Sequence, residues 1–214
     1  MSDAENERVV WGVVSSRAMR VHWALAELGL TYRTVAIETR TPAMETPEFL
    51  AVNPRKKIPV FQDGTLVLTE SPAIVTYLAE RYSTDERRLI PTSHAARGHY
   101  FEWMSFVSME LDATSLYVLR RHEALPNIYG EAPAANEAAR GYFARMMDAA
   151  ALRLADQRDY LLGDAFSGAD ILMMTCLDWA IRYDCALPEP FMDYRDRVAK
   201  RPGYLAATQA NKAR

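Results

Sequence analysis

The sequence predicts two domains of different class: an α/β domain with a mixed sheet over residues 1–82 and an all-α domain over residues 93–214. The pattern of the chain changes between them. Short β-rich runs alternate with helical patterns in the first part, and only helical spacing is found in the second. Residues 83–92 are charged and contain Pro91 near their end, which is typical of a linker. A length of 214 residues leaves room for two small domains.

The first domain is expected to begin with a buried strand and a helix. Val9–Val14 is a continuous apolar run of strand length, as found in strands that are buried on both faces. Val21, Leu25 and Leu28 follow at helical spacing, and Gly29 stands at the place of a helix C-cap. These residues predict the first two elements of a βαβ unit.

The next segment is expected to add three strands and a short helical patch. In chain order these are a strand over Tyr32–Ile37, a helical patch over Pro47–Val52, and strands over Ile58–Gln62 and Thr65–Leu68. Asp63-Gly64 lies between the last two strands and predicts a hairpin turn.

A helix with clear boundary signals is expected to complete the first domain. Ser71 is predicted as its N-cap and Pro72 as its first residue, and Tyr82 belongs to its apolar stripe. The predicted order joins a parallel βαβ unit to an antiparallel hairpin, and this arrangement gives a mixed sheet with helices packed on it.

The second domain is expected to contain helices over Ser93–Arg121, Ala134–Gln157 and Ile171–Ile181. The last of these is apolar nearly all round, which indicates a buried central helix. Ser167 followed three residues later by Asp170 predicts a capping box at its start. We expect these two residues to have a structural role.

Composition and charge exclude several classes of partner. A net charge of −3 gives no general attraction to nucleic acid or to an anionic membrane. No run of about 18 apolar residues is present, and Met1–Arg8 lacks the apolar stretch of a signal peptide. Cys176 and Cys185 have no zinc-ligand spacing, so we expect free buried thiols and no metal. A cytoplasmic protein is expected.

Four blocks of residues resemble the cytosolic glutathione transferase family. Ser15–Val21 (SSRAMRV) is similar to the serine-containing helix start of the zeta, theta and delta classes. The other blocks are Asn53–Val60 (NPRKKIPV), Leu68–Ile74 (LTESPAI) and Phe166–Ile171 (FSGADI), and all four occur in the family's order. The resemblance implies a thioredoxin-like fold for the first domain, a homodimer, and glutathione as a co-substrate.

The resemblance also implies where glutathione binds. Ser71 and the start of its helix offer free N–H groups to the γ-glutamyl carboxylate, and Glu70 is expected to pair with the ammonium group. A cis bond between Ile58 and Pro59 is implied, which turns the Ile58 backbone outward to pair with the cysteinyl residue. Lys57 is expected to bind the glycyl carboxylate.

The neighbouring cations are expected to act differently. Arg55 and Lys56 add only long-range attraction for the anionic tripeptide. Many relatives have glycine at the position of Lys56, so the shape of this loop is left open.

Ser15 is the predicted activating residue. A thiol with a pKa near 8.5 is a few per cent ionised at pH 7, and the thiolate is the nucleophile. Lowering this pKa by about two units requires about 2.7 kcal/mol. A charge-assisted hydroxyl hydrogen bond of about 1.5–3 kcal/mol and a helix terminus worth about 0.3–1 kcal/mol are sufficient. Ser16 is the alternative activator, and Trp11 stands where the tyrosine-using classes place their phenol.

The predicted function is transfer of the glutathione thiolate to a hydrophobic electrophile, a detoxification reaction. The electrophile is expected between Ser15 and the first long helix of the all-α domain. Candidates to line this second-substrate site, left unassigned, are Ser105, Ser108, Met109, Asp112 and Tyr117. A glutathione-dependent peroxidase, lyase, dehalogenase or isomerase uses the same site, and a non-enzymatic binding or regulatory protein keeps the same fold.

Overall fold

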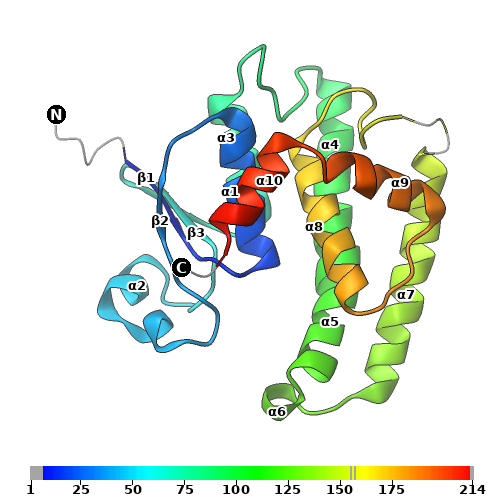
Figure 1. The fold of residues 1–214 in the computed structure, drawn as a ribbon, viewed down its shortest axis with the longest axis horizontal. Helices are drawn as coiled ribbons and strands as arrows, with labels where there is room; N and C mark the ends of the chain where they lie inside the picture. Colours follow the sequence, from blue (N-terminus) through cyan, green and yellow to red (C-terminus); the bar gives the residue numbers. More distant parts are fainter. Residues whose placement is uncertain (1–6, 155, 157, 213–214) are drawn as a thin grey trace. The chain divides into compact units, whose positions relative to one another are not determined.

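The computed structural model describes residues 7–154, 156 and 158–212 (Figure 1). Most of the polar N-terminal segment Met1–Arg8 and the end of the helix expected over residues 134–157 lie outside the described residues. Packing divides the chain into two compact units. The first extends to Ile90 and also includes the segment from Ala199 onward, and the second is Pro91–Val198.

The C-terminal segment therefore differs from the expected division, in which residues 93–214 formed the all-α domain. Helix α10 (Pro202–Ala210) packs on α1 (Ser16–Leu28) of the first unit. The rings of Tyr204 and Trp23 meet edge to face at 5.0 Å between centroids, and Ala207 is buried. The reason for the difference is that α10 buries its apolar face on the first unit. Helical spacing alone does not specify the surface that a helix covers.

The first unit contains a four-stranded mixed sheet in the order β2-β1-β3-β4 (Figure 1). The strands are β1 (Arg8–Trp11), β2 (Arg33–Val35), β3 (Val60–Asp63) and β4 (Leu66–Thr69). β1 runs parallel to β2 and antiparallel to β3, and β3 and β4 form the hairpin. The prediction of a mixed sheet in a thioredoxin-like domain is confirmed.

The hairpin turn lies one residue later than the sequence predicts. Asp63 remains in β3 and pairs with Leu66, so the turn residues are Gly64 and Thr65. The Asp63 carboxylate accepts hydrogen bonds from the hydroxyl groups of Tyr77 at 2.8 Å and Tyr82 at 2.6 Å. These bonds to α3 (Ser71–Tyr82) hold Asp63 in the strand. The Asp-Gly turn signal depends only on neighbouring residues, so it does not account for contacts with a later helix.

The helices of the first unit begin and end near their sequence signals. They are α1, η2 (Pro42–Glu45), α2 (Pro47–Val52), α3 (Ser71–Tyr82) and α10. α1 ends at Gly29, which has a φ of 67° and donates its N–H to the Ala26 carbonyl. Glycine adopts this left-handed conformation without a steric cost, so the predicted C-cap is confirmed.

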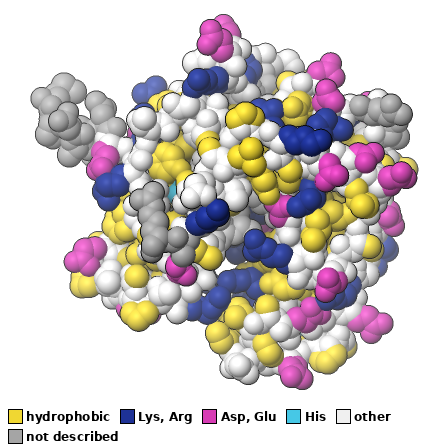
Figure 2. Space-filling model, viewed as in Figure 1, with side chains coloured by type: hydrophobic (Ala, Val, Ile, Leu, Met, Phe, Trp, Pro, Cys, Tyr) yellow, Lys and Arg dark blue, Asp and Glu magenta, His cyan; other side chains and the backbone are white. Residues whose placement is uncertain are grey.

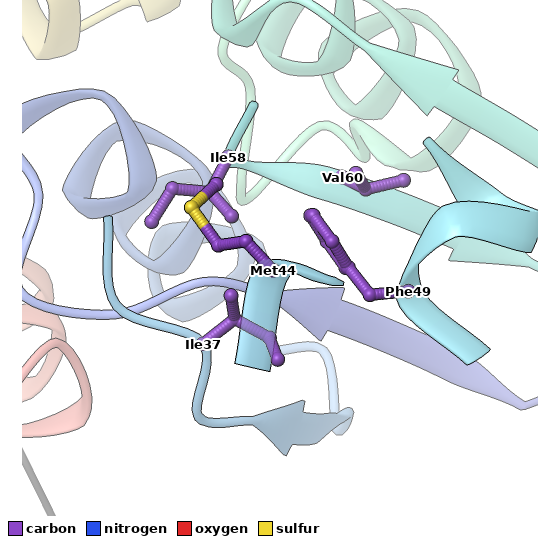
Figure 3. Close-up of a cluster of buried hydrophobic side chains, with 5 residues drawn as sticks. All are labelled: Ile37, Met44, Phe49, Ile58 and Val60. Atoms are coloured by element: carbon purple, nitrogen blue, oxygen red, sulfur yellow. The ribbon is translucent and has the colours of Figure 1, made fainter. Parts of the chain in front are cut away.

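A small hydrophobic cluster supports the strand β3 and the loop before it. It consists of Ile37, Met44, Phe49, Ile58 and Val60 (Figure 3). The side chains come from η2, α2, β3 and the segments after β2 and before β3, and each is buried. Burial of a side chain of this size contributes about 1.5–3 kcal/mol. The cluster therefore fixes the segment that precedes β3.

The described part of the second unit is helical, as predicted. Its elements are α4 (His94–Phe106), η3 (Val107–Leu116), α5 (Tyr117–Leu119), η4 (Arg120–Ala124), α6 (Pro126–Tyr129), α7 (Pro133–Ala151), η5 (Leu152–Leu154), α8 (Gly168–Arg182) and α9 (Glu189–Val198). α4, η3 and α5 follow one another as one long helix, which lies beside α7 and α8 (Figure 1), and most of α8 is buried. The predicted central helix is thus confirmed.

Two stretches of π-helix interrupt the first long helix of this unit, η3 and η4, where the sequence predicts regular helix. Within η3 the Ser115 hydroxyl donates to the carbonyl of Glu110 at 2.7 Å, five residues earlier. The Ser108 hydroxyl donates to the carbonyl of Met104 at 2.7 Å. Hydroxyl groups that donate to backbone carbonyls of the preceding turn compete with the backbone hydrogen bonds of a regular α-helix. This competition agrees with the wider π-helical turns of η3.

The start of α8 confirms the predicted capping box. The Asp170 carboxylate is fully buried and accepts hydrogen bonds of 2.8 Å from the Ser167 N–H, the Ser167 hydroxyl, the Leu161 N–H and the Tyr194 hydroxyl. With four donors around it, this carboxylate is satisfied by the fold itself. Ser167 and Asp170 connect α8 to its surroundings and are structural.

Acidic and basic side chains both occur over the face of the molecule seen in Figure 2, interspersed with hydrophobic ones. Within the described residues, no helix has the length and apolar character needed to cross a membrane.

Candidate functional site

The register of the sheet brings three loops to one edge. Trp11 pairs with Val60, and Val60 pairs with Thr69 on its other side. The last residue of β1, the first of β3 and the last of β4 are therefore in line. The loop after β1, the loop before β3 and the start of α3 must lie next to one another at this edge. They carry the seven residues that the sequence predicts to bind glutathione, namely Ser15, Ser16, Lys57, Ile58, Pro59, Glu70 and Ser71.

The loop after β1 makes a close approach to the loop before β3. Gly12 has a φ of 128°, and a Cβ atom added to it would lie 2.8 Å from the Cβ of Ile58. Its carbonyl accepts a 3.0 Å hydrogen bond from Nε2 of the buried His22, whose Nδ1 lies 2.9 Å from the Tyr32 hydroxyl. Only glycine fits this position, because a side chain would collide with Ile58.

Each of the three loops contains a non-glycine residue in the left-handed region. Val14 has a φ of 53°, Lys56 of 51° and Glu70 of 67°. Such conformations cost about 1–3 kcal/mol each and persist where the surrounding structure fixes them. They are found preferentially at binding and catalytic sites. Glycine at the position of Lys56 would adopt this backbone conformation without the steric cost.

Ser15 is the N-cap of α1, with extended backbone angles of φ −145° and ψ 133°. Its Oγ accepts a hydrogen bond from the Ala18 N–H at 3.4 Å. Among the described residues, the Ser15 hydroxyl has no acceptor for its own proton. Ser16 is the first residue of α1, and both serines are half-buried. The Trp11 indole N–H is bonded to Gln62 at 2.6 Å.

The peptide bond between Ile58 and Pro59 is cis, as the family resemblance implied. β3 begins only at Val60. Among the described residues, neither the N–H nor the carbonyl of Ile58 has a hydrogen-bond partner. One backbone donor and one acceptor are therefore free at the edge of the sheet, in the arrangement that pairs with an extended peptide.

The three cations of this loop have different environments. Lys56 pairs with Glu45 at 2.5 Å, and Arg55 pairs with Glu70 at 3.2 Å and also contacts Thr69. Lys57 is exposed, and no acidic group of the described residues pairs with its ammonium. Among the described residues these contacts leave Lys57 as the cation of the loop without an acidic partner. Its binding to the glycyl carboxylate stays a prediction. Arg55 and Lys56 were predicted to act at long range only, and the contacts that they make within the fold were not anticipated.

Ser71 differs in one respect from its prediction. α3 begins at Ser71 itself, and Glu70 is the N-cap without a capping side-chain bond. The buried Ser71 hydroxyl instead accepts a 3.2 Å hydrogen bond from Nη1 of the buried Arg20 on α1. The Arg20 side chain comes from another helix, so the Ser71 hydroxyl connects α3 with α1 and does not cap its own helix.

Electrostatics at this edge favour an anion. α1 and α3 both begin here, and neither has an acidic residue in its first turn. Each helix start is worth about 0.3–1 kcal/mol to a nearby negative charge. Within the described residues no group of three or more His, Cys, Asp or Glu side chains is placed to hold a metal ion. Cys176 and Cys185 form no disulfide among the described residues. Cys176 is buried as expected, whereas Cys185 is only half-buried and lies 3.5 Å from Nη1 of Arg140.

Comparisons with known proteins agree with this arrangement. The family model of the glutathione S-transferase N-terminal domain matches residues 8–80, and that of the C-terminal domain matches residues 104–202. Glutathione S-transferase 3 of Zea mays is 32% identical over 203 residues, which cover 92% of this chain and 90% of the relative. The chain belongs to the glutathione S-transferase family. The sequence-based predictions of this family, of its fold and of an enzyme are confirmed.

Solved glutathione S-transferases have the same architecture. The theta-class enzyme of the citrus canker pathogen Xanthomonas axonopodis pv. citri, solved with glutathione bound, is 28% identical, with a TM-score of 0.79 over 95% of this chain and 97% of that chain. The ternary complex of BphK, a bacterial glutathione S-transferase, is 26% identical, with a TM-score of 0.80 over 95% of this chain and 98% of that chain.

Three residues that adjoin the site were not predicted. Arg20 and His22 look like ordinary helix residues in the sequence, but both are buried and hydrogen-bonded to the site loops. Asn211 follows α10 and bonds to the loop that carries Ser15. The sequence does contain a sign that Arg20 and His22 are unusual, since both are polar residues on the apolar stretch of the predicted helix. Asn211 has no comparable signal.

Proposed function

We propose that this glutathione S-transferase binds glutathione along the sheet edge and that Ser15 stabilises the sulfur of the bound tripeptide as a thiolate. The observation that carries the proposal is the free backbone pair of Ile58, which lies between the starts of α1 and α3. An extended peptide that pairs with Ile58 would have its two ends near the other predicted ligands. This geometry suits a tripeptide with a carboxylate at each end.

In this pose each end of glutathione has a partner. The γ-glutamyl carboxylate accepts from the Ser71 N–H and hydroxyl, since the hydroxyl oxygen is already bonded to Arg20 and its proton remains to be donated. The ammonium group pairs with the exposed Glu70 carboxylate. The glycyl carboxylate pairs with Lys57.

The proposed role of Ser15 depends on its hydroxyl group being both an acceptor and a donor of hydrogen bonds. Its oxygen accepts from the Ala18 N–H, which makes its O–H a better donor because hydrogen bonds in a chain polarise one another. A donated bond to a thiolate is worth about 1.5–3 kcal/mol, and the start of α1 adds about 0.3–1 kcal/mol. Together these terms lower the pKa of the bound thiol by about two units. Among the described residues, no N–H group donates a hydrogen bond to the Ser16 hydroxyl.

In the proposed reaction, the thiol of glutathione loses its proton to solvent on binding, and the thiolate attacks an electrophilic carbon of an apolar second substrate. A sulfur–carbon bond forms, and the bond to the leaving group breaks with its electron pair. Catalysis comes from thiolate stabilisation and from positioning the two reactants. A peroxidase, lyase, dehalogenase or isomerase reaction starts from the same thiolate, and a binding or regulatory role without turnover is the other candidate. We include a cytoplasmic homodimer and a part in detoxification in this proposal.

The test separates binding, ionisation and transfer. Retention on immobilised glutathione measures binding, thiolate absorbance in the ultraviolet measures the thiol pKa in the complex, and turnover with an aryl halide measures transfer. We expect Ser15→Ala to lower kcat at least about tenfold and to change the glutathione KM little, because about 1.4 kcal/mol or more of thiolate stabilisation is lost. Ser16→Ala is the matched control. A larger effect in the Ser16 variant assigns the role to that residue, and an unshifted thiol pKa in the wild-type complex rejects the proposal.

A further inference from the structure

The chain returns to the first unit after the second and ends beside the loop that carries Ser15. Along α10, Arg201 pairs with Glu27 of α1 at 2.7 Å, and Tyr204 packs edge-on against Trp23. Ala207 is buried in the same contact. In Figure 1 the red helix α10 lies against the blue helix α1. These contacts hold α10 on α1 along its length, so the residue that follows α10 has a defined place.

Asn211 is that residue, and it makes three hydrogen bonds to two consecutive residues of the loop. Its backbone carbonyl accepts from the Val14 N–H at 2.8 Å. Its side-chain Oδ1 accepts from the Ser15 N–H at 3.4 Å, and its Nδ2 donates to the Ser15 carbonyl at 3.2 Å. The amide group thus contacts both polar backbone groups of Ser15, as a neighbouring strand would.

The loop needs such support because of its backbone conformation. Val14 is β-branched and half exposed, and its φ of 53° lies in the left-handed region. This conformation costs about 1–3 kcal/mol and persists only where the surroundings fix it. The direction of the Ser15 side chain depends on the backbone of these two residues. A shift of about 1 Å in a catalytic group costs up to about a hundredfold in rate.

We propose that Asn211 is a positioning residue for Ser15, in that its amide and its carbonyl hold Val14 and Ser15 in the conformation that presents the Ser15 hydroxyl to the glutathione sulfur. The inference rests on the proposed function of Ser15. A planar amide is the group that supplies both an acceptor and a donor here. Aspartate keeps only the acceptor, and alanine keeps neither.

The experiment compares Asn211→Ala and Asn211→Asp with Lys212→Ala as the control. Lys212 is the next residue, it is exposed, and its ammonium donates a hydrogen bond to the Gln209 side chain at 2.8 Å. Two quantities are measured in each protein: deuterium exchange of the backbone amides over residues 12–19, and the pKa of the thiol of bound glutathione from its thiolate absorbance. kcat and KM for glutathione are measured alongside.

We expect exchange at residues 14 and 15 to rise about tenfold or more in Asn211→Ala, since the loop opens locally. The thiol pKa should rise by about 0.5–1 unit, and kcat should fall about three- to tenfold at a pH below the wild-type thiol pKa, with KM little changed. Asn211→Asp should show less exchange than Asn211→Ala and at least as large a pKa rise, because it adds a negative charge near the thiolate. Lys212→Ala should match the wild type.

Two results overturn the inference while the proposed function stands. One is unchanged exchange over residues 12–19 in Asn211→Ala. The other is an unchanged thiol pKa in Asn211→Ala under conditions in which Ser15→Ala raises it. A wild-type complex whose thiol titrates like free glutathione rejects the proposed function and this role of Asn211 with it, and the wild-type titration alone identifies that case.

Discussion

The Arg20 guanidinium donates a 3.2 Å hydrogen bond to the Ser71 hydroxyl, and both side chains are buried. The bond joins α1 to the first residue of α3, so the two helices whose starts adjoin the proposed glutathione site are directly connected. Because the hydroxyl oxygen accepts from Arg20, the direction of the remaining O–H is restricted. If Ser71 binds the γ-glutamyl group as we propose, this contact connects the stability of the first unit with glutathione binding.

Replacing Ser71 tests this connection. We expect Ser71→Ala to lower the free energy of unfolding by about 1–3 kcal/mol, because a buried guanidinium loses an acceptor. The glutathione KM should rise about tenfold, since a charge-assisted hydrogen bond of about 1.5–3 kcal/mol to the carboxylate is lost. Urea denaturation and initial-rate kinetics measure the two effects. Ser71→Thr keeps the hydroxyl and should bind glutathione better than Ser71→Ala, and equal KM values for the two variants would contradict the assignment.

Lys57 and Lys56 are adjacent cations with different expected effects. Lys57 has no acidic partner among the described residues, whereas Lys56 pairs with Glu45 at 2.5 Å. We expect Lys57→Ala to raise the glutathione KM about three- to tenfold at low salt with kcat unchanged, because an exposed ion pair is worth up to about 1 kcal/mol and is screened by salt. Lys56→Ala is the control and should change KM less than twofold. A salt-independent KM in the wild type argues against Lys57 as the ligand.

The left-handed backbone of Lys56 gives a stability prediction. Its φ is 51°, and a non-glycine residue pays about 1–2 kcal/mol in this region. Lys56→Gly and Lys56→Ala both lose the exposed pair with Glu45, so they differ only in the backbone term. We expect Lys56→Gly to be about 1 kcal/mol more stable than Lys56→Ala, since the flexibility of glycine in the unfolded chain offsets part of the gain. Thermal unfolding of the pair measures the difference, and equal midpoints would show that the loop relaxes.

Much of the fold could be predicted because its signals are local. Gly29 ends α1 as a C-cap, the segment Pro47–Val52 is helical, and Ser167 with Asp170 starts α8. In each case a few consecutive residues decide the conformation of the backbone. The hairpin turn was placed one residue early because Asp63 is held by tyrosines of α3, and these are distant in the sequence.

The site shows the same division between local and distant determinants. The seven predicted residues lie in short motifs, and the register of the strands brings these motifs together. Arg20 could not be assigned, because its partner Ser71 is 51 positions away. Asn211 could not be assigned either, because it meets Ser15 across 196 positions and only after α10 has packed on α1. Periodicity and short motifs in the sequence thus identify the candidate binding residues, but they do not identify the residues that hold these in place.

The two tyrosine hydroxyl groups on Asp63 predict how the first unit responds to alkali. Burial, together with the hydrogen bond to Asp63, raises the pKa of Tyr77 from its ordinary value near 10 to about 12, and the same causes raise the pKa of Tyr82. Between about pH 10 and pH 12 the folded protein therefore binds more protons than the unfolded chain does. The stability that these two tyrosines contribute is fully present below about pH 10 and is lost as the pH rises through this window.

Tyr77→Phe should reduce this dependence on pH. The variant loses a hydrogen bond worth about 1 kcal/mol at neutral pH, and its free energy of unfolding should fall less steeply above pH 10, since one raised pKa is removed. Urea unfolding at a series of pH values from 8 to 12 measures the slope, and tyrosinate absorbance follows the titration directly. Tyr129→Phe, in an exposed part of the second unit, is the control. A Tyr77→Phe slope equal to that of the wild type would mean that Asp63 does not hold the Tyr77 phenol in its protonated form.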